Sequence, residues 1–197
     1  MKKFSLIFCF IIFCISQIFA QSALKVGNNA FLFSSVDQYG KVVDLKTELK
    51  KGPVVLFFYR GSWCPYCNKQ MAELEDSIGL IRAKGATVIA VTPETKESMK
   101  KIINKSKADF SIIHDEGYKI MNAYNVSFNI DSSTLAKYRS MNLLLSEANG
   151  TNDVKLPVPA TYIIGTDGKI KYSYFDTNFR VRVSVAELLN NINNINN

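Results

Sequence analysis

The stretch that decides the fold is R-G-S-W-C-P-Y-C at residues 60–67. The apolar, β-branched and aromatic run at 53–59 comes directly before it and predicts a buried strand. After it, apolar residues recur at helical spacing over 71–81, and Gly85 follows as a helix stop. The two cysteines therefore lie where a central strand ends and a helix begins.

The position of Cys64 and Cys67 at a helix start predicts dithiol chemistry. Pro65 suits the first helical turn, where a missing N–H has no cost. Cys64 would lie at the positive end of the helix dipole, which favours the thiolate, and we expect its sulfur to be exposed. Cys67 follows one turn later and is close enough to resolve a bond formed at Cys64. We predict Cys64 as the nucleophile, Cys67 as the resolving thiol, and a redox-active disulfide between them.

Two other roles are open to the cysteine pair, a structural disulfide and a metal site. The loop that Cys64 and Cys67 close is very short, so a disulfide there stabilises the fold little through chain entropy. Zinc takes four ligands, and His114 is the chain's single histidine. We predict no metal and no cofactor, and we interpret His114 as a surface or hydrogen-bonded residue rather than a base.

Residues 1–20 have the layout of a secretory signal peptide. Lys2 and Lys3 precede an apolar run over 4–15, and cleavage is expected after Ala20. The alternative is a membrane anchor, but the run is shorter than the roughly 20 residues that span a bilayer. We therefore predict one domain at 21–197, exported to the periplasm or another extracytoplasmic compartment, with no stable membrane span after removal of the signal.

Composition bounds the class of the protein. A chain of 197 residues with 47% hydrophobic residues suits a single globular domain. The formal charge is +7, from 24 basic and 17 acidic residues, but the lysines are scattered and do not form a basic stripe. We predict no nucleic-acid partner; the expected partners are a protein thiol or disulfide, acting as reductant or client, and a peroxide.

The order of the remaining elements predicts an α/β/α sandwich with three layers. It begins with a β-hairpin over 31–45 and ends with a second hairpin and a helix that Ser184 opens. Between them we expect strands and helices in alternation; they are strands at 87–91 and 110–113, a helix capped by Thr92, a helical segment at 118–124, and strands at 161–164 and 170–174.

Two segments do not follow this alternation. Residues 125–156 lack a steady period, and we interpret them as a partly helical insertion near the active face, before the late hairpin. The asparagine-rich end from Asn190 is expected to fray.

The chain resembles the thioredoxin fold, on C-P-Y-C after the first central strand and V-P-A-T-Y-I-I at 158–164. Within that fold it is similar to the alkyl hydroperoxide reductase and thiol-specific antioxidant (AhpC/TSA) family, over roughly 25–125 and 156–190. The resemblance implies an antioxidant oxidoreductase. It also implies that Pro159 is the thioredoxin-type proline, cis and facing the cysteines, with free backbone at Val158 to receive an extended substrate.

Two departures from the family bear on mechanism. Gly61 stands where peroxiredoxins have Thr or Ser, and Pro159 stands where they have an arginine. Without these donors a peroxide loses stabilisation of developing charge, unless Arg60, Ser62 or Arg180 supplies it.

Three functions follow from the residues and the resemblance. The departures favour thiol–disulfide exchange, with a thioredoxin-dependent thiol peroxidase, Cys64 being peroxidatic, as the alternative. A third hypothesis is a binding module with an inert disulfide, whose insertion docks a partner. Trp63 and Tyr66 either form an apolar lip for docking or simply cover the helix end.

Overall fold

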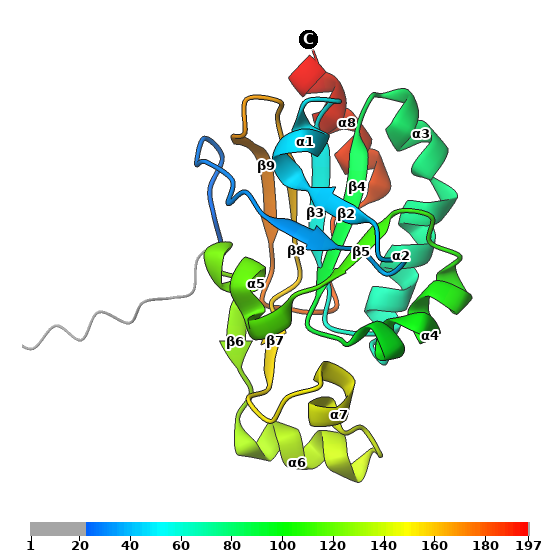
Figure 1. Cartoon of the computed structure of the whole chain (residues 1–197), viewed down its shortest axis with the longest axis vertical. Coiled ribbons are helices and arrows are strands. Elements are labelled where there is room, and N and C mark those ends of the chain that lie inside the picture. Colours follow the sequence, from blue (N-terminus) through cyan, green and yellow to red (C-terminus); the bar gives the residue numbers. More distant parts are fainter. Residues whose placement is uncertain (1–22, 197) are drawn as a thin grey trace, which may run out of the picture.

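The computed structural model describes residues 23–196, and Figure 1 shows their arrangement. The predicted signal peptide at 1–20 lies outside the described residues. At the centre is a mixed sheet in the order β5–β4–β3–β8–β9. Its strands are β3 (Val54–Phe58), β4 (Thr87–Thr92), β5 (Ser111–His114), β8 (Ala160–Ile164) and β9 (Ile170–Phe175).

Strand β3 is the middle strand of this sheet and leads directly to the cysteines. It pairs parallel to β4 and antiparallel to β8, with Phe58 opposite Val91 on one side and Ala160 on the other. All five of its residues are buried, because both faces of the sheet are covered by other elements. This is why the sequence here is a continuous apolar run rather than an alternation.

One face of the sheet is covered by the N-terminal hairpin and short helices. Alternate residues Val54, Leu56 and Phe58 join this core. Figure 1 shows the hairpin crossing in front of the sheet. The covering elements are β1 (Ser34–Val36), β2 (Val42–Asp44), α1 (Leu45–Leu49), the 3₁₀ turn η1 (Glu116–Tyr118) and α5 (Lys119–Ala123).

The other face packs against the longer helices. Val55, Phe57 and Tyr59 point into this core, which also contains both cysteines. The helices are α2 (Pro65–Asp76), α3 (Ile78–Ala83), α4 (Lys96–Ser106) and α8 (Val185–Asn196). Helices, sheet, and hairpin with helices form the three predicted layers, so the thioredoxin-like sandwich with its N-terminal hairpin is confirmed.

Three details differ from the prediction. The helical pattern over 71–81 is broken at Ser77, which separates α2 from α3. Helix α4 is capped by Thr95, which accepts from the Ser98 amide, because Thr92 is still within β4. Helix α8 does not fray from Asn190 but continues to Asn196, because Ile192 is buried against the sheet and anchors its second half.

The insertion at 125–156 is partly helical, as predicted, and its ends pair with each other. Strands β6 (Ser127–Asn129) and β7 (Lys155–Pro157) are antiparallel, and α6 (Ser132–Ser140) and α7 (Leu145–Asn149) lie between them. Figure 1 shows both helices at one end of the molecule, beyond the ends of the strands of the central sheet. The amide of Thr95 donates to the Ala148 carbonyl at 2.9 Å, which ties α7 to the start of α4.

None of the helices within residues 23–196 combines the length and the apolar character that crossing a membrane requires.

Candidate functional site

Cys64 is the N-cap residue of α2, with Pro65 in the first helical turn, as the sequence predicts. Its carbonyl accepts from the amides of Cys67 at 3.1 Å and Asn68 at 3.0 Å. Both cysteines are free thiols, one turn apart. The expectation of an exposed sulfur is wrong, because Cys64 is only 1% exposed and Cys67 is fully buried.

The two thiols of the pair have very different pKa values. A hydrogen bond from the Cys67 thiol, with help from its backbone and from the charges of Arg60 and Arg182, lowers the pKa of Cys64 to about 6, although burial opposes the shift. Burial, followed by the hydrogen bond to Cys64, raises the pKa of Cys67 well above its usual value. Cys64 is therefore the thiolate near neutral pH, and Cys67 keeps its proton.

Arg60 lies between the end of β3 and the cysteines, and its guanidinium is enclosed by aromatic rings. Its Cζ is 4.3 Å from the ring centroid of Phe179, 4.9 Å from that of Trp63 and 6.0 Å from that of Tyr138. Its Nη2 donates to the Tyr138 hydroxyl, and its buried Nε–H has no hydrogen-bond partner. A buried positive charge is thus held close to Cys64.

Arg182 is a second cation at the cysteines, and the sequence analysis missed it. Its Nη2 is 3.8 Å from the Cys67 Sγ, and its Nε donates to Gln70 Oε1 at 3.1 Å. The carbonyls of Val181, at 2.7 Å, and Phe179 accept from its Nη1. The only sequence signal was its place two residues after Arg180, which lines the pocket instead.

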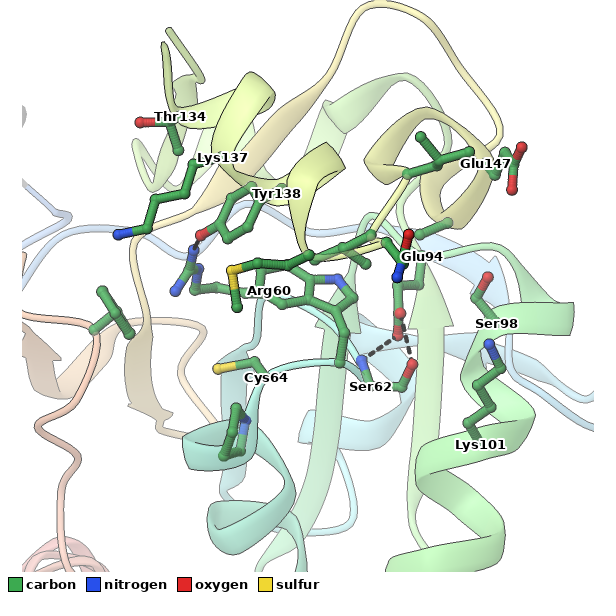
Figure 2. A pocket seen from close by; sticks show the side chains of 18 of the residues that line it. Arg60, Ser62, Cys64, Glu94, Ser98, Lys101, Thr134, Lys137, Tyr138 and Glu147 are labelled. Carbon is green, nitrogen blue, oxygen red and sulfur yellow. Dashed lines mark hydrogen bonds between the residues drawn. The ribbon is translucent and has the colours of Figure 1, made fainter. Parts of the chain in front are cut away.

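Glu94 is a buried carboxylate beside the cysteine turn, between β4 and α4, and the sequence analysis gave it no role. Its two oxygens accept from the Ser62 amide at 2.7 Å and the Ser62 hydroxyl at 2.8 Å (Figure 2). Burial raises the pKa of Glu94 to about 7. Because the Ser62 proton is directed at Glu94, Ser62 does not replace the missing family hydroxyl as a donor.

Gly61 departs from the family because Trp63 occupies the space of a side chain there. A Cβ on Gly61 would lie 2.3 Å from Trp63 Nε1 and 3.0 Å from Glu94 Cδ. The Trp63 Nε1–H is buried and has no hydrogen-bond partner. The Trp63 indole therefore fills the space beside Gly61, and a threonine side chain at position 61 would collide with it.

Pro159 and Val158 do not form the expected docking edge. No peptide bond within the described residues is cis, so the prediction of a cis bond before Pro159 is wrong. Val158 is also not open to a substrate chain, because its amide donates to the Val126 carbonyl at 2.7 Å where the insertion begins. Both residues are buried, and neither lines the pocket that Cys64 lines.

Trp63 and Tyr66 have different surroundings. Trp63 lines the pocket beside Cys64 and packs on Tyr138 of α6, with ring centroids 5.3 Å apart. Tyr66 is 37% exposed and packs edge-on against Phe179 at 5.9 Å. His114 donates from its Nδ1 to the Glu94 carbonyl at 2.7 Å, in line with the prediction of a hydrogen-bonded histidine.

A pocket of about 890 Å³ opens above Cys64. Its floor includes Cys64, Trp63 and Glu94, and its opposite wall is formed by α6, α7 and the segment between them. Figure 2 shows Tyr138 and Lys137 of α6 above Cys64, with Lys101 and Ser98 of α4 at the other side. The insertion thus forms part of the site, and Cys64 is reached through this pocket.

Comparison with known proteins decides the family. The sequence profile of the AhpC/TSA family matches residues 26–173. This chain belongs to the AhpC/TSA family. The curated proteins that it is similar to include peroxiredoxins and thiol-disulfide oxidoreductases, in line with the resemblance.

The individual relatives include both peroxiredoxins and thiol-disulfide oxidoreductases. The chain is 29% identical over 163 residues to the chloroplastic peroxiredoxin Q of Triticum aestivum, covering 83% of this chain and 64% of the relative. It is 28% identical over 148 residues to the thiol-disulfide oxidoreductase ResA of Bacillus anthracis, covering 75% and 68%. The match thus spans a little under two thirds of the peroxiredoxin Q chain.

Solved structures show the same fold. Peroxidoxin BcpB from Mycobacterium tuberculosis superposes with a TM-score of 0.67 at 19% identity, covering 87% of this chain and 98% of that one.

Proposed function

We propose that this protein is a thiol peroxidase in which Cys64 is peroxidatic and Cys67 resolving. This was the alternative to thiol–disulfide exchange in the sequence analysis, and the peroxiredoxin Q relatives support it. The observation that carries it is the setting of Cys64, whose sulfur is ionised near neutral pH yet buried at the floor of a pocket. A hydroperoxide can reach such a sulfur through the pocket.

The reaction follows from the two sulfurs. The Cys64 thiolate attacks the distal oxygen of a hydroperoxide, the O–O bond breaks, and the alkoxide leaves as an alcohol after protonation. Cys64 is then a sulfenic acid. The Cys67 thiol condenses with it, forming the Cys64–Cys67 disulfide and releasing water, and an external dithiol of the thioredoxin type reduces that disulfide by exchange.

The charged groups at the site fit this reaction. The guanidiniums of Arg60 and Arg182 stabilise the Cys64 thiolate, and Arg60 also lines the pocket, where its positive charge can stabilise negative charge that develops on oxygen. Glu94 lines the same pocket and is about half protonated at pH 7, so it can supply the proton that the leaving alkoxide takes. These groups take the place of the threonine and the arginine that peroxiredoxins have and that this chain lacks.

The test is stopped-flow oxidation of the reduced protein by hydrogen peroxide and by an organic hydroperoxide. Trp63 is the chain's only tryptophan and adjoins Cys64, so its fluorescence reports the oxidation. We expect a second-order rate constant at least about a thousandfold above that of free cysteine. Cys64→Ser should abolish the signal, while Cys67→Ser should keep the oxidation step and lose the disulfide. Oxidation at the rate of a free thiol would overturn the proposal.

Thiol–disulfide exchange is the second candidate, favoured by the two-residue spacing of C-P-Y-C and the likeness to ResA. It predicts that the reduced protein reduces a disulfide peptide much faster than it reduces any hydroperoxide. Turnover of both substrates under one set of conditions separates the candidates.

We also infer that residues 1–20 are a signal peptide and that the protein acts outside the cytoplasm. The support is the sequence pattern of two lysines and an apolar run before Ala20. N-terminal sequencing of the protein from an extracytoplasmic fraction should begin at Gln21, and an intact Met1 would contradict the inference.

A further inference from the structure

The pocket above Cys64 is far larger than hydrogen peroxide needs. Its volume of about 890 Å³ lies in the range of pockets that hold drug-sized molecules, about 300–1,000 Å³. The excess space lies between the active site and the insertion, since α6, α7 and their connection line one side of it. The size of the pocket indicates a substrate with a substantial organic group.

The walls near Cys64 suit an apolar or aromatic group. Trp63 and Phe179 line the pocket from the body of the protein. Met141 and Leu144 line it from the insertion, and they are 66% and 41% exposed. Exposed apolar side chains that gather around a pocket are typical of a ligand site.

The rim of the pocket is positively charged. Lys101 on α4, Lys137 on α6 and Arg180 line it, and none of the three forms an ion pair within the described part of the chain. Figure 2 shows Lys101 and Lys137 on opposite sides of the pocket with Cys64 between them. The acidic groups of the lining are Glu147 and the half-protonated Glu94, so the cations are in excess.

We propose that this pocket binds an organic hydroperoxide that carries a carboxylate. The aromatic and apolar walls hold its hydrocarbon part, the unpaired cations attract its carboxylate, and its O–O group is presented to Cys64. The inference rests on the proposed peroxidase function and names its substrate class. The covalent step is unchanged: Cys64 gains the distal oxygen and the carboxylate-bearing alcohol is released.

The test compares two hydroperoxides with one skeleton. Cumene hydroperoxide is neutral at pH 7, and its para-carboxylate derivative carries one negative charge. Stopped-flow Trp63 fluorescence of the full chain gives the rate constant for each, and their ratio removes effects on sulfur reactivity. We expect a preference of about tenfold for the carboxylate at low salt, which should shrink toward unity near 1 M salt, where the Debye length is about 3 Å.

Variants at the rim locate the preference. Lys101→Gln and Lys137→Gln should each reduce the ratio about two- to fivefold, and the double variant should nearly abolish it. The matched controls are Lys105→Gln on α4 and Arg139→Gln on α6, which remove exposed cations outside this pocket and should leave the ratio unchanged.

The outcomes separate this inference from the function on which it rests. Fast oxidation by both hydroperoxides with a ratio near one, or a ratio that the double variant preserves, overturns the inference and leaves the peroxidase intact. Slow oxidation by both, at the rate of free cysteine, overturns the peroxidase itself.

Discussion

Replacing Cys67 by alanine or by serine should affect the ionisation of Cys64 differently. The hydrogen bond from the Cys67 thiol is the largest cause of the low pKa of Cys64. Cys67→Ala removes this donor, whereas Cys67→Ser replaces it by a hydroxyl of similar reach. We expect the alanine variant to raise the pKa of Cys64 and the serine variant to keep it close to its present value.

The size of the effect follows from the energy of one hydrogen bond to a charged group. Such a bond contributes about 1.5–3 kcal/mol, and one pKa unit corresponds to about 1.4 kcal/mol. From a starting value of about 6, Cys67→Ala should therefore raise the pKa of Cys64 to about 7–8. At pH 7 the thiolate fraction falls from about 90% to about 10–50%, and alkylation slows in proportion.

The assay is the pH dependence of iodoacetamide alkylation, measured on the Cys64 peptide by mass spectrometry so that other thiols do not contribute. Circular dichroism checks that each variant is folded. Two results would refute the reasoning: a wild-type midpoint near 8.5, as for an ordinary cysteine, or an equal shift in the alanine and serine variants.

Two further changes test the packing around the cysteine turn. Burial holds the pKa of Glu94 at about 7, above its usual 4.5, so its ionisation contributes a loss of about 3 kcal/mol of stability as pH rises through this interval. The low pKa of Cys64 contributes in the opposite direction, so the loss is measured as the difference between wild type and a Glu94 variant. The Glu94→Gln variant should lack this loss. The free energy of unfolding in urea is measured for both proteins at pH 5 and at pH 8, and an equal change with pH in wild type and variant would contradict the prediction. Gly61→Thr restores the family residue but should cost about 1–3 kcal/mol in thermal unfolding, because its Cβ would lie 2.3 Å from Trp63 Nε1. Adding Trp63→Val should recover most of that stability, and a single variant as stable as wild type would show that the space is not filled.

Local patterns in the sequence predicted the central strand, the cysteine turn, both hairpins and the order of the layers. These elements have strong signals, because β3 is apolar throughout and α4 and α8 bury one face each. The insertion gave no such signal, since α6 buries none of its residues and its sequence has no apolar stripe. The resemblance predicted free backbone at Val158, but the Val158 amide donates to Val126 where the insertion begins, because a motif does not specify how a neighbouring insertion pairs with the chain.

The sequence alone predicted where the two thiols lie, because a thiol at the start of a helix with a second thiol one turn later is a local arrangement. The surroundings of that thiol were decided by tertiary structure. Arg182 reaches Cys67 across 115 residues, Tyr138 reaches Arg60 across 78, and Glu94 reaches Ser62 across 32. Contacts between residues so far apart leave no periodic trace in a sequence, yet they place Cys64 at the floor of a pocket.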